Sequence, residues 1–145
     1  MSVHLIKLSV GCESVASKRA WIKQYLAFKA TRGLPVEYDH VTRMTPKRLD
    51  ELLAGGSIYW VIQGVIQARQ KLIDIRPFDD ADGVKRCQLV MDPTVVPTRP
   101  QPRRPFQGWR YLKAEDAPAD LAEGDDDASA MSADMQRDLA KLGLL

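Results

Sequence analysis

Residues 57–78 constrain the fold most, because they form a long β-rich run that is interrupted by a single glycine. Alternation in the first half places three large apolar side chains on one face of a strand: Ile58, Trp60 and Ile62. Gly64 then separates this strand from a second run at residues 65–78. The pattern predicts two consecutive strands joined by a turn.

The second run changes phase along its length. Ile66, Ala68 and Leu72 predict burial of the even-numbered positions, whereas Ile73 and Ile75 predict burial of the odd-numbered ones. Such a slip is typical of a β-bulge or a sharp bend, which strands adopt when they coil around a small barrel. We therefore predict an α+β fold built on a small bent β-barrel of mixed or antiparallel strands.

Two helices are expected in the first third of the chain. The first follows a strand at residues 3–10, begins after Ser14 and ends at Gly33. Its apolar stripe is expected to pack in the core: Trp21, Ile22, Tyr25, Leu26 and Phe28. The second helix is expected to begin at Thr45, with a proline at its first position, and to end before Gly55.

Further β-structure is expected after this region. Residues 78–86 predict a turn, and a strand that ends at Pro93 should bury Cys87, Leu89 and Met91. The four prolines in residues 97–105 exclude regular pairing there except at a sheet edge. The sequence GWRYLK then favours one closing strand.

Size and charge divide the chain into a body and a tail. The chain has 145 residues, of which 45% are hydrophobic, so one domain can bury a continuous core. Residues 1–114 carry 19 Lys and Arg against 10 Asp and Glu, whereas residues 115–145 carry 2 against 9. We predict a single basic domain over residues 1–114 and an acidic, largely disordered tail. The spacing of Met135, Leu139 and Leu142 favours a short terminal helix within that tail.

Several functional classes lack their signatures in this sequence. The two cysteines, Cys12 and Cys87, form no pair with zinc-ligand spacing, and phosphate-loop, dinucleotide and nucleophile-elbow motifs are absent. No stretch resembles a signal peptide or a membrane span. We expect a cytoplasmic protein without metal or cofactor, and a non-catalytic one. Cys12 lies where a helix N-terminus stabilises a thiolate, although a lone cysteine is more often a small buried residue.

Binding has broader support in the sequence than catalysis. The solvent-leaning face of residues 57–71 carries an aromatic ring, two amides and two cations: Tyr59, Gln63, Gln67, Arg69 and Lys71. The proline-stiffened segment TRPQPRRPFQGWRYL adds cations and rings: Arg103, Arg104, Phe106, Trp109 and Arg110. Three more cations lie at the expected start of the second helix, where they oppose the helix dipole: Arg43, Lys47 and Arg48. Cations hold phosphates, amides read base edges and aromatic rings stack on bases.

Four segments carry a resemblance to a known family: HLIKLSVGCES, HVTRMTPKR, GGSIYWVIQGVIQARQKLIDI and RRPFQGWRYLKAEDAP. They resemble the uncharacterised bacterial family called domain of unknown function 1489, typical of alphaproteobacteria. The resemblance extends to Pro118 and implies no activity. The segment GGSIYWVIQGVIQARQKLIDIRPF is also similar in pattern to the PUA-like superfamily with its ASCH and EVE members. That resemblance implies a small bent barrel with RNA or a modified nucleobase bound in a cleft beside it.

The leading hypothesis is a module that binds RNA or a nucleotide through the basic and aromatic residues named above. A second is a small hydrolase that acts on a nucleobase-like substrate, as some ASCH proteins resemble amidohydrolases. Thr42 or Thr45 with Lys47 and Glu51 imitates their residue set, but the spacing matches no motif and no role is carried over. A third is a protein-interaction domain whose acidic tail docks on its own basic face or on a partner.

Overall fold

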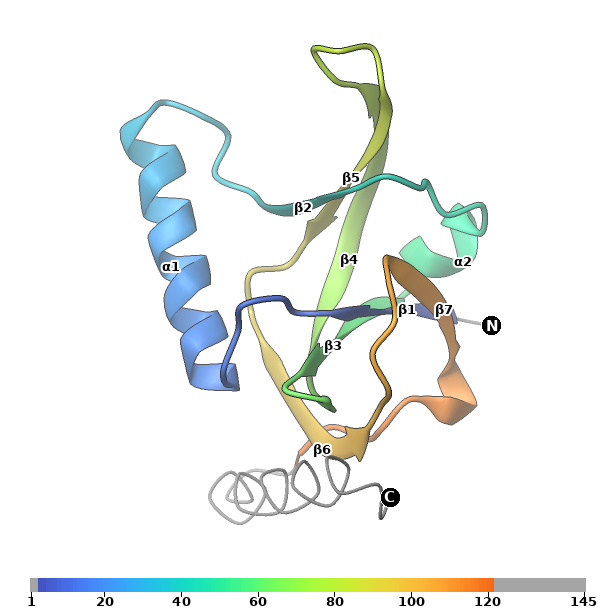
Figure 1. Ribbon diagram of the computed structural model, residues 1–145. Helices are drawn as coiled ribbons and strands as arrows, with labels where there is room; N and C mark the ends of the chain where they lie inside the picture. Colours follow the sequence, from blue (N-terminus) through green and yellow to red (C-terminus); the bar gives the residue numbers. More distant parts are fainter. Residues whose placement is uncertain (1–2, 122–145) are drawn as a thin grey trace.

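The computed structural model describes residues 3–121, which contain two α-helices, seven strands and one 3-10 turn (Figure 1). In chain order the elements are β1 (Val3–Leu8), α1 (Val15–Thr31), β2 (Tyr38–Thr42), α2 (Leu49–Leu53), β3 (Ser57–Ile62), β4 (Val65–Asp79), β5 (Lys85–Met91), β6 (Val96–Pro102), β7 (Trp109–Lys113) and η1 (Ala114–Asp116). The predicted α+β class is confirmed.

The strands form one mixed sheet with the order β2-β5-β4-β3-β1-β7, and β6 pairs with β4 beside this path. β1 and β3 pair in parallel, and the other pairs are antiparallel. Within residues 3–121 no pairing joins β2 to β7, so the sheet is not closed. The predicted barrel is therefore not confirmed.

Strand β4 connects the two halves of the sheet. It pairs with β3 and β6 along its first half and with β5 along its second half, and its register with β5 shifts between Leu72 and Asp74. The predicted phase slip is confirmed at this point. The predicted burial of Ile73 is wrong, because the residue at the register shift faces outward and is 54% exposed, while Ile75 is buried.

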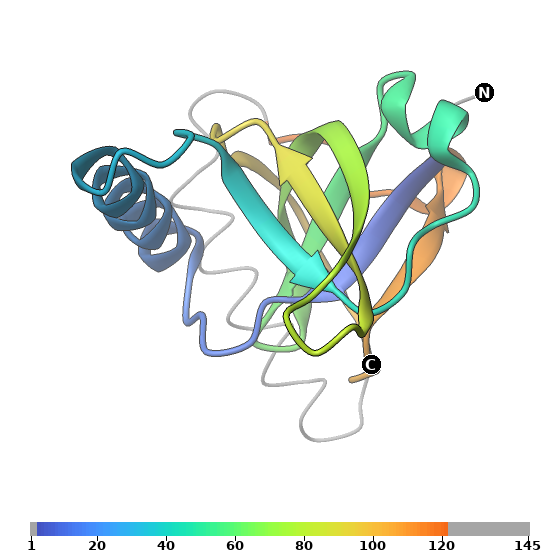
Figure 2. The ribbon, with the colours of Figure 1, turned by 90° about the horizontal axis from the view of Figure 1, so that it is seen from above.

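Helix α1 lies at one end of the sheet beside β2, and α2 lies at the opposite end (Figures 1 and 2). Ser14 caps α1 as predicted, because its side chain accepts the backbone N–H of Ser17. Only one side of this helix contacts the sheet, so Ile22 is buried whereas Trp21 and Phe28 are 55% and 52% exposed. The prediction that the whole aromatic stripe enters the core is wrong for these two rings.

Helix α2 is shorter than the sequence predicts, since it begins at Leu49 and not after Thr45. Arg48 is the N-cap of this helix, and its carbonyl accepts the Leu52 N–H at 3.0 Å. The backbone N–H groups of Lys47 and Arg48 donate to the Tyr111 hydroxyl, at 2.8 and 3.2 Å. Tyr111 belongs to β7, which pairs with β1. The strand that GWRYLK predicts is therefore confirmed, but within residues 3–121 it lies at the end of the strand order and does not close the sheet. Contact with this strand holds residues 47 and 48 outside the helix.

The core contains a buried amide whose oxygen and nitrogen are both hydrogen-bonded. Gln70 is 0% exposed; its side chain accepts the indole N–H of Trp60 at 2.9 Å and donates to the carbonyl of Asp92 at 2.9 Å. Buried polar groups are tolerated when each has such a partner. Gln70 thereby fixes the ring of Trp60, which is itself 1% exposed.

The predictions on membrane spans and on the C-terminal tail can be compared with the structure only over residues 3–121. Within the described residues, neither helix has the length and apolar character needed to span a bilayer. The predicted terminal helix and most of the predicted acidic tail lie outside the described residues.

We expect Gln70→Leu to lower the free energy of unfolding by at least about 2 kcal/mol, because it leaves the Trp60 indole N–H and the Asp92 carbonyl without partners. Urea unfolding followed by circular dichroism measures this loss. The matched control is Gln67→Leu, since Gln67 is half-buried and donates one hydrogen bond to the Ile62 carbonyl. Equal losses in the two variants would contradict a special role for Gln70.

Candidate functional site

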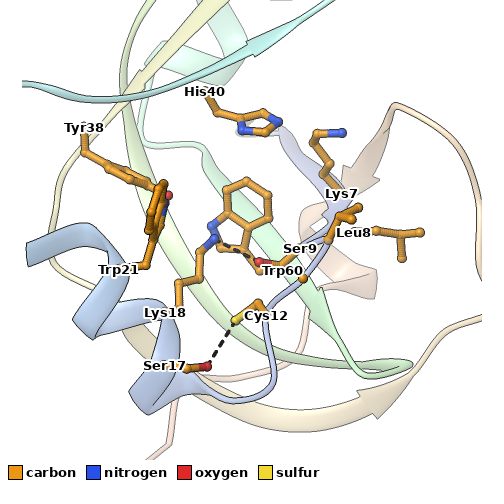
Figure 3. Close-up of a pocket in the computed structure, with 12 residues that line it drawn as sticks. Lys7, Leu8, Ser9, Cys12, Ser17, Lys18, Trp21, Tyr38, His40 and Trp60 are labelled. Atoms are coloured by element: carbon orange, nitrogen blue, oxygen red, sulfur yellow. Dashed lines mark hydrogen bonds between the residues drawn. The ribbon is translucent and has the colours of Figure 1, made fainter. Parts of the chain in front are cut away.

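A cavity of about 460 Å³ lies between the N-terminal half of α1, the loop after β1, and strands β2 and β3 (Figure 3). Twelve residues line it: Lys7, Leu8, Ser9, Val10, Gly11, Cys12, Ser17, Lys18, Trp21, Tyr38, His40 and Trp60. Its volume falls in the range of small-molecule sites. No Asp or Glu is among these lining residues.

Trp60 is the central ring of this pocket. Its indole is held by Gln70, and the Lys18 Nζ lies 3.6 Å from the ring centroid. The imidazole of His40 meets the same indole edge to face, with 5.7 Å between centroids and an interplanar angle of 84°. Trp60 thus carries a cation and a second aromatic ring.

Lys18 is an unusual cation because it is only 5% exposed. Its ammonium donates to the Ser9 hydroxyl at 3.0 Å, and no carboxylate contacts it within residues 3–121. Burial lowers its pKa from 10.5 to about 8. The contact with the Trp60 ring favours the charged form and offsets part of this desolvation.

Lys7 and His40 form the wall of the pocket that lies across the Trp60 ring from Lys18 (Figure 3). Lys7 is paired in register with Trp60 of β3 on one side and with Trp109 of β7 on the other. Burial lowers the pKa of Lys7. Burial also lowers the pKa of His40 to about 4, with smaller contributions from the Lys7 and Lys18 charges. At neutral pH His40 is therefore uncharged, with one ring nitrogen that donates and one that accepts.

Two aromatic side chains form the wall next to α1. Trp21 projects from the helix beside Tyr38 of β2 (Figure 3). Burial raises the pKa of Tyr38 to about 12, so its hydroxyl stays protonated at neutral pH. Cys12 lies below them, and its thiol donates to the Ser14 carbonyl at 3.2 Å and is 3.7 Å from the Ser17 hydroxyl.

The pocket therefore combines flat rings with positive charge that no acidic lining residue balances. Such a site favours an anionic ligand with a planar ring system, because the anion balances the cations and the ring packs on the aromatic walls. Within residues 3–121 no three His, Cys, Asp or Glu side chains gather as a metal-ligand set.

The predicted binding residues do not form one surface, because strand alternation divides them between the two faces of the sheet. Trp109 lies on the pocket side, in the row that contains Trp60 and Lys7. Its indole N–H donates to the Met44 carbonyl at 2.8 Å, so β7 contacts the segment that carries three predicted cations. These are Arg43, Lys47 and Arg48, all exposed, and Arg48 is ion-paired with Glu51.

The other face carries Tyr59, Arg69, Phe106 and Arg110. Tyr59 is 5% exposed and packs in a second apolar cluster, so its expected position on a solvent face is wrong. Arg69 forms two hydrogen bonds of 2.7 Å with Asp120, which occupy much of its guanidinium. Arg110 stacks over the half-buried Phe106 at 4.7 Å.

The remaining predicted residues lie around the β3–β4 turn and the proline-rich loop. Gln63 donates to the Cys12 carbonyl at 3.3 Å, next to the pocket, and Gln67 donates to the Ile62 carbonyl at 2.9 Å. The Arg103 backbone N–H donates to the Gly64 carbonyl at 2.9 Å, and Arg104 is exposed. Gln63 alone among these contacts a residue that lines the pocket.

None of the twelve residues that line the pocket belongs to the set of binding residues that the sequence predicts. Cys12 was noted, but Lys18 and His40 carry no sequence signal, because their importance depends on burial against Trp60. Trp21 was assigned to the core through its helical spacing. A ring four positions before Tyr25 gives the same pattern whether it packs inward or borders a cavity.

Comparison with known proteins identifies a family without a described activity. The family model with the description "Protein of unknown function (DUF1489)" matches residues 5–145. No curated protein and no solved structure matches the chain.

We expect Lys18→Met to change how stability depends on pH. Between pH 8 and 10.5 the unfolded chain holds a proton on Lys18 that the folded chain has lost, so the wild-type free energy of unfolding rises with pH in this window. Relative to Lys18→Met, the wild type should gain on the order of 2 kcal/mol from pH 7.5 to pH 10. Urea unfolding at each pH measures the difference.

Lys23→Met is the matched control, because Lys23 is exposed on the same helix. Its stability should follow that of the wild type at every pH. A difference between wild type and Lys18→Met that does not vary with pH would contradict the burial of an unpaired ammonium.

Proposed function

The chain belongs to the family described as "Protein of unknown function (DUF1489)", and we propose that it binds a nucleotide, free or within RNA, in the pocket beside α1. The observation that carries this proposal is the buried ammonium of Lys18, which borders the cavity and has no carboxylate partner among residues 3–121. A buried charge is costly unless it is paired. A phosphate in the cavity supplies the missing partner.

The phosphate position is proposed between Lys18 and Lys7. Both lysines line the cavity, and burial lowers the pKa of each, so each gains from an anion. An anion that contacts both lysines forms charge-assisted hydrogen bonds in a partly dry environment, where they are stronger than in water.

The base is proposed to stack on Trp21. This indole is 55% exposed and borders the cavity, so one face is accessible to a planar ligand. His40, which is neutral because its pKa is about 4, offers one donor and one acceptor to a base edge. Stacking with edge recognition is the usual way in which proteins bind unpaired bases.

A longer RNA strand is proposed to continue from the pocket across Lys7 and Trp109. The exposed cations Arg43 and Lys47 flank Trp109 through its contact with Met44, and they are suited to the adjacent phosphates. Arg103, Arg104 and Arg110 lie on or beside the other face and are assigned a weaker role in this proposal. The proposal includes a PUA-like arrangement, in which the sheet stays open and the ligand lies beside it. It also includes a cytoplasmic location.

We expect Trp21→Ala to weaken binding of adenosine monophosphate, and of a five-nucleotide oligoadenylate, by about tenfold or more, since stacking contributes roughly 1–3 kcal/mol per base. Isothermal titration calorimetry at low salt measures both ligands. Phe28→Ala is the matched control, because Phe28 lies on the same helix, is 52% exposed and does not line the cavity. Oligoadenylate affinity should also fall as salt rises.

The absence of binding for both ligands at low salt would overturn the proposal and favour a protein-interaction domain. Equal losses in Trp21→Ala and Phe28→Ala would remove the pocket as the site. Turnover of a bound nucleoside would instead favour the small hydrolase.

Binding of the phosphate should also be linked to proton uptake. The pKa of Lys18 is about 8 in the free protein, and a bound anion raises it, so at pH 8.5 the complex should take up about half a proton or more. Calorimetry of adenosine monophosphate in Tris and in HEPES reveals this uptake as a buffer-dependent enthalpy. Lys18→Met should remove the buffer dependence, and a dependence that persists in this variant would assign the proton to another group.

A further inference from the structure

We propose that the pocket also captures carbonyl compounds covalently, with the Lys18 amine forming an imine to a flat, anionic aldehyde. The inference rests on the proposed function in one respect, because it places the ring of the aldehyde where the base of a nucleotide would lie. The anion of the aldehyde is placed at Lys7, so that the Lys18 amine is left to meet the carbonyl carbon. It adds a reactive group that simple binding does not need.

Lys18 lines the cavity, and its surroundings can hold the amine in the neutral as well as in the charged form. Its Nζ is held between the face of Trp60, at 3.6 Å, and the Ser9 hydroxyl, at 3.0 Å. A hydroxyl serves a neutral amine as well as an ammonium, because it both donates and accepts. The other titratable residues that line the cavity come from every neighbouring element: Lys7 from β1, Cys12 from the following loop, and Tyr38 and His40 from β2. Cys12 acts to raise the pKa of Lys18, but this effect is smaller than that of burial. None of these lining residues carries a carboxylate that would hold the proton on the amine.

Burial supplies the neutral form at physiological pH. With a pKa of about 8, about a quarter of Lys18 is unprotonated at pH 7.5, whereas an ordinary lysine is almost wholly protonated there. Lysines that are desolvated in apolar pockets are the ones that act as Schiff-base nucleophiles in enzymes.

The reaction balances without another reactant. The Nζ lone pair attacks the carbonyl carbon, a C–N bond forms and the C–O π bond opens. A proton moves from nitrogen to oxygen to give a carbinolamine. Loss of one water molecule, which takes the remaining amine proton and the hydroxyl group, leaves the imine.

Pyridoxal 5′-phosphate is the probe, since it joins a planar ring, a phosphate and an aldehyde. The full-length protein is incubated with it at pH 7.5, reduced with sodium borohydride and mapped by peptide mass spectrometry. Lys18 should carry at least tenfold more adduct than Lys23, an exposed lysine of the same helix. Adenosine monophosphate should protect Lys18 and leave Lys23 unchanged. This comparison uses wild-type protein only and needs no variant to fold.

Variants then separate the candidate nucleophiles. Lys18→Arg should lose the adduct, whereas Lys23→Arg should keep it, because Lys23 is exposed and does not line the cavity. Equal labelling of Lys18 and Lys23 would overturn the inference.

Pyridoxine 5′-phosphate, which lacks the aldehyde, distinguishes covalent capture from nucleotide binding. If pyridoxine 5′-phosphate and adenosine monophosphate bind but Lys18 is not labelled, covalent capture is wrong and nucleotide binding is supported. If neither compound binds and Lys18 is not labelled, both proposals are wrong.

Discussion

The position of the Trp60 ring is the constraint on which the rest of this structure depends. The ring is placed by the parallel pairing of β1 with β3 and is fixed by the Gln70 amide, which accepts its indole N–H. The ring packs in the hydrophobic core, and it also forms part of the wall of the cavity beside α1. Because one side chain serves both purposes, the site is as rigid as the core that supports it.

The same ring explains why Lys18 can be buried although no carboxylate among residues 3–121 pairs with it. An indole face partly compensates a nearby ammonium, although less well than a carboxylate would. The remaining desolvation appears as the lowered pKa values of Lys18 and His40. Groups with such perturbed titration gather more often at functional sites than elsewhere.

Much of the fold was predictable because its signals are local. The Ser14 cap, the phase slip in β4 and the strand at residues 109–113 all depend on short sequence patterns, and the structure confirms them. The predicted binding residues are a different matter. Side chains on adjacent positions of a strand point to opposite faces, so Trp109 and Arg110 cannot serve one surface. Which residues meet was decided by the strand order.

The sequence by itself determined the class of the fold, the positions of most strands and the basic character of the body, because alternation, capping and charge are written in consecutive residues. Only the tertiary structure decided that Lys7, Lys18 and His40 meet around Trp60 and that Tyr59 is buried. Those outcomes depend on contacts between segments far apart in the chain. Burial and lost hydration then alter the chemistry of each group, and no single residue pattern encodes that change.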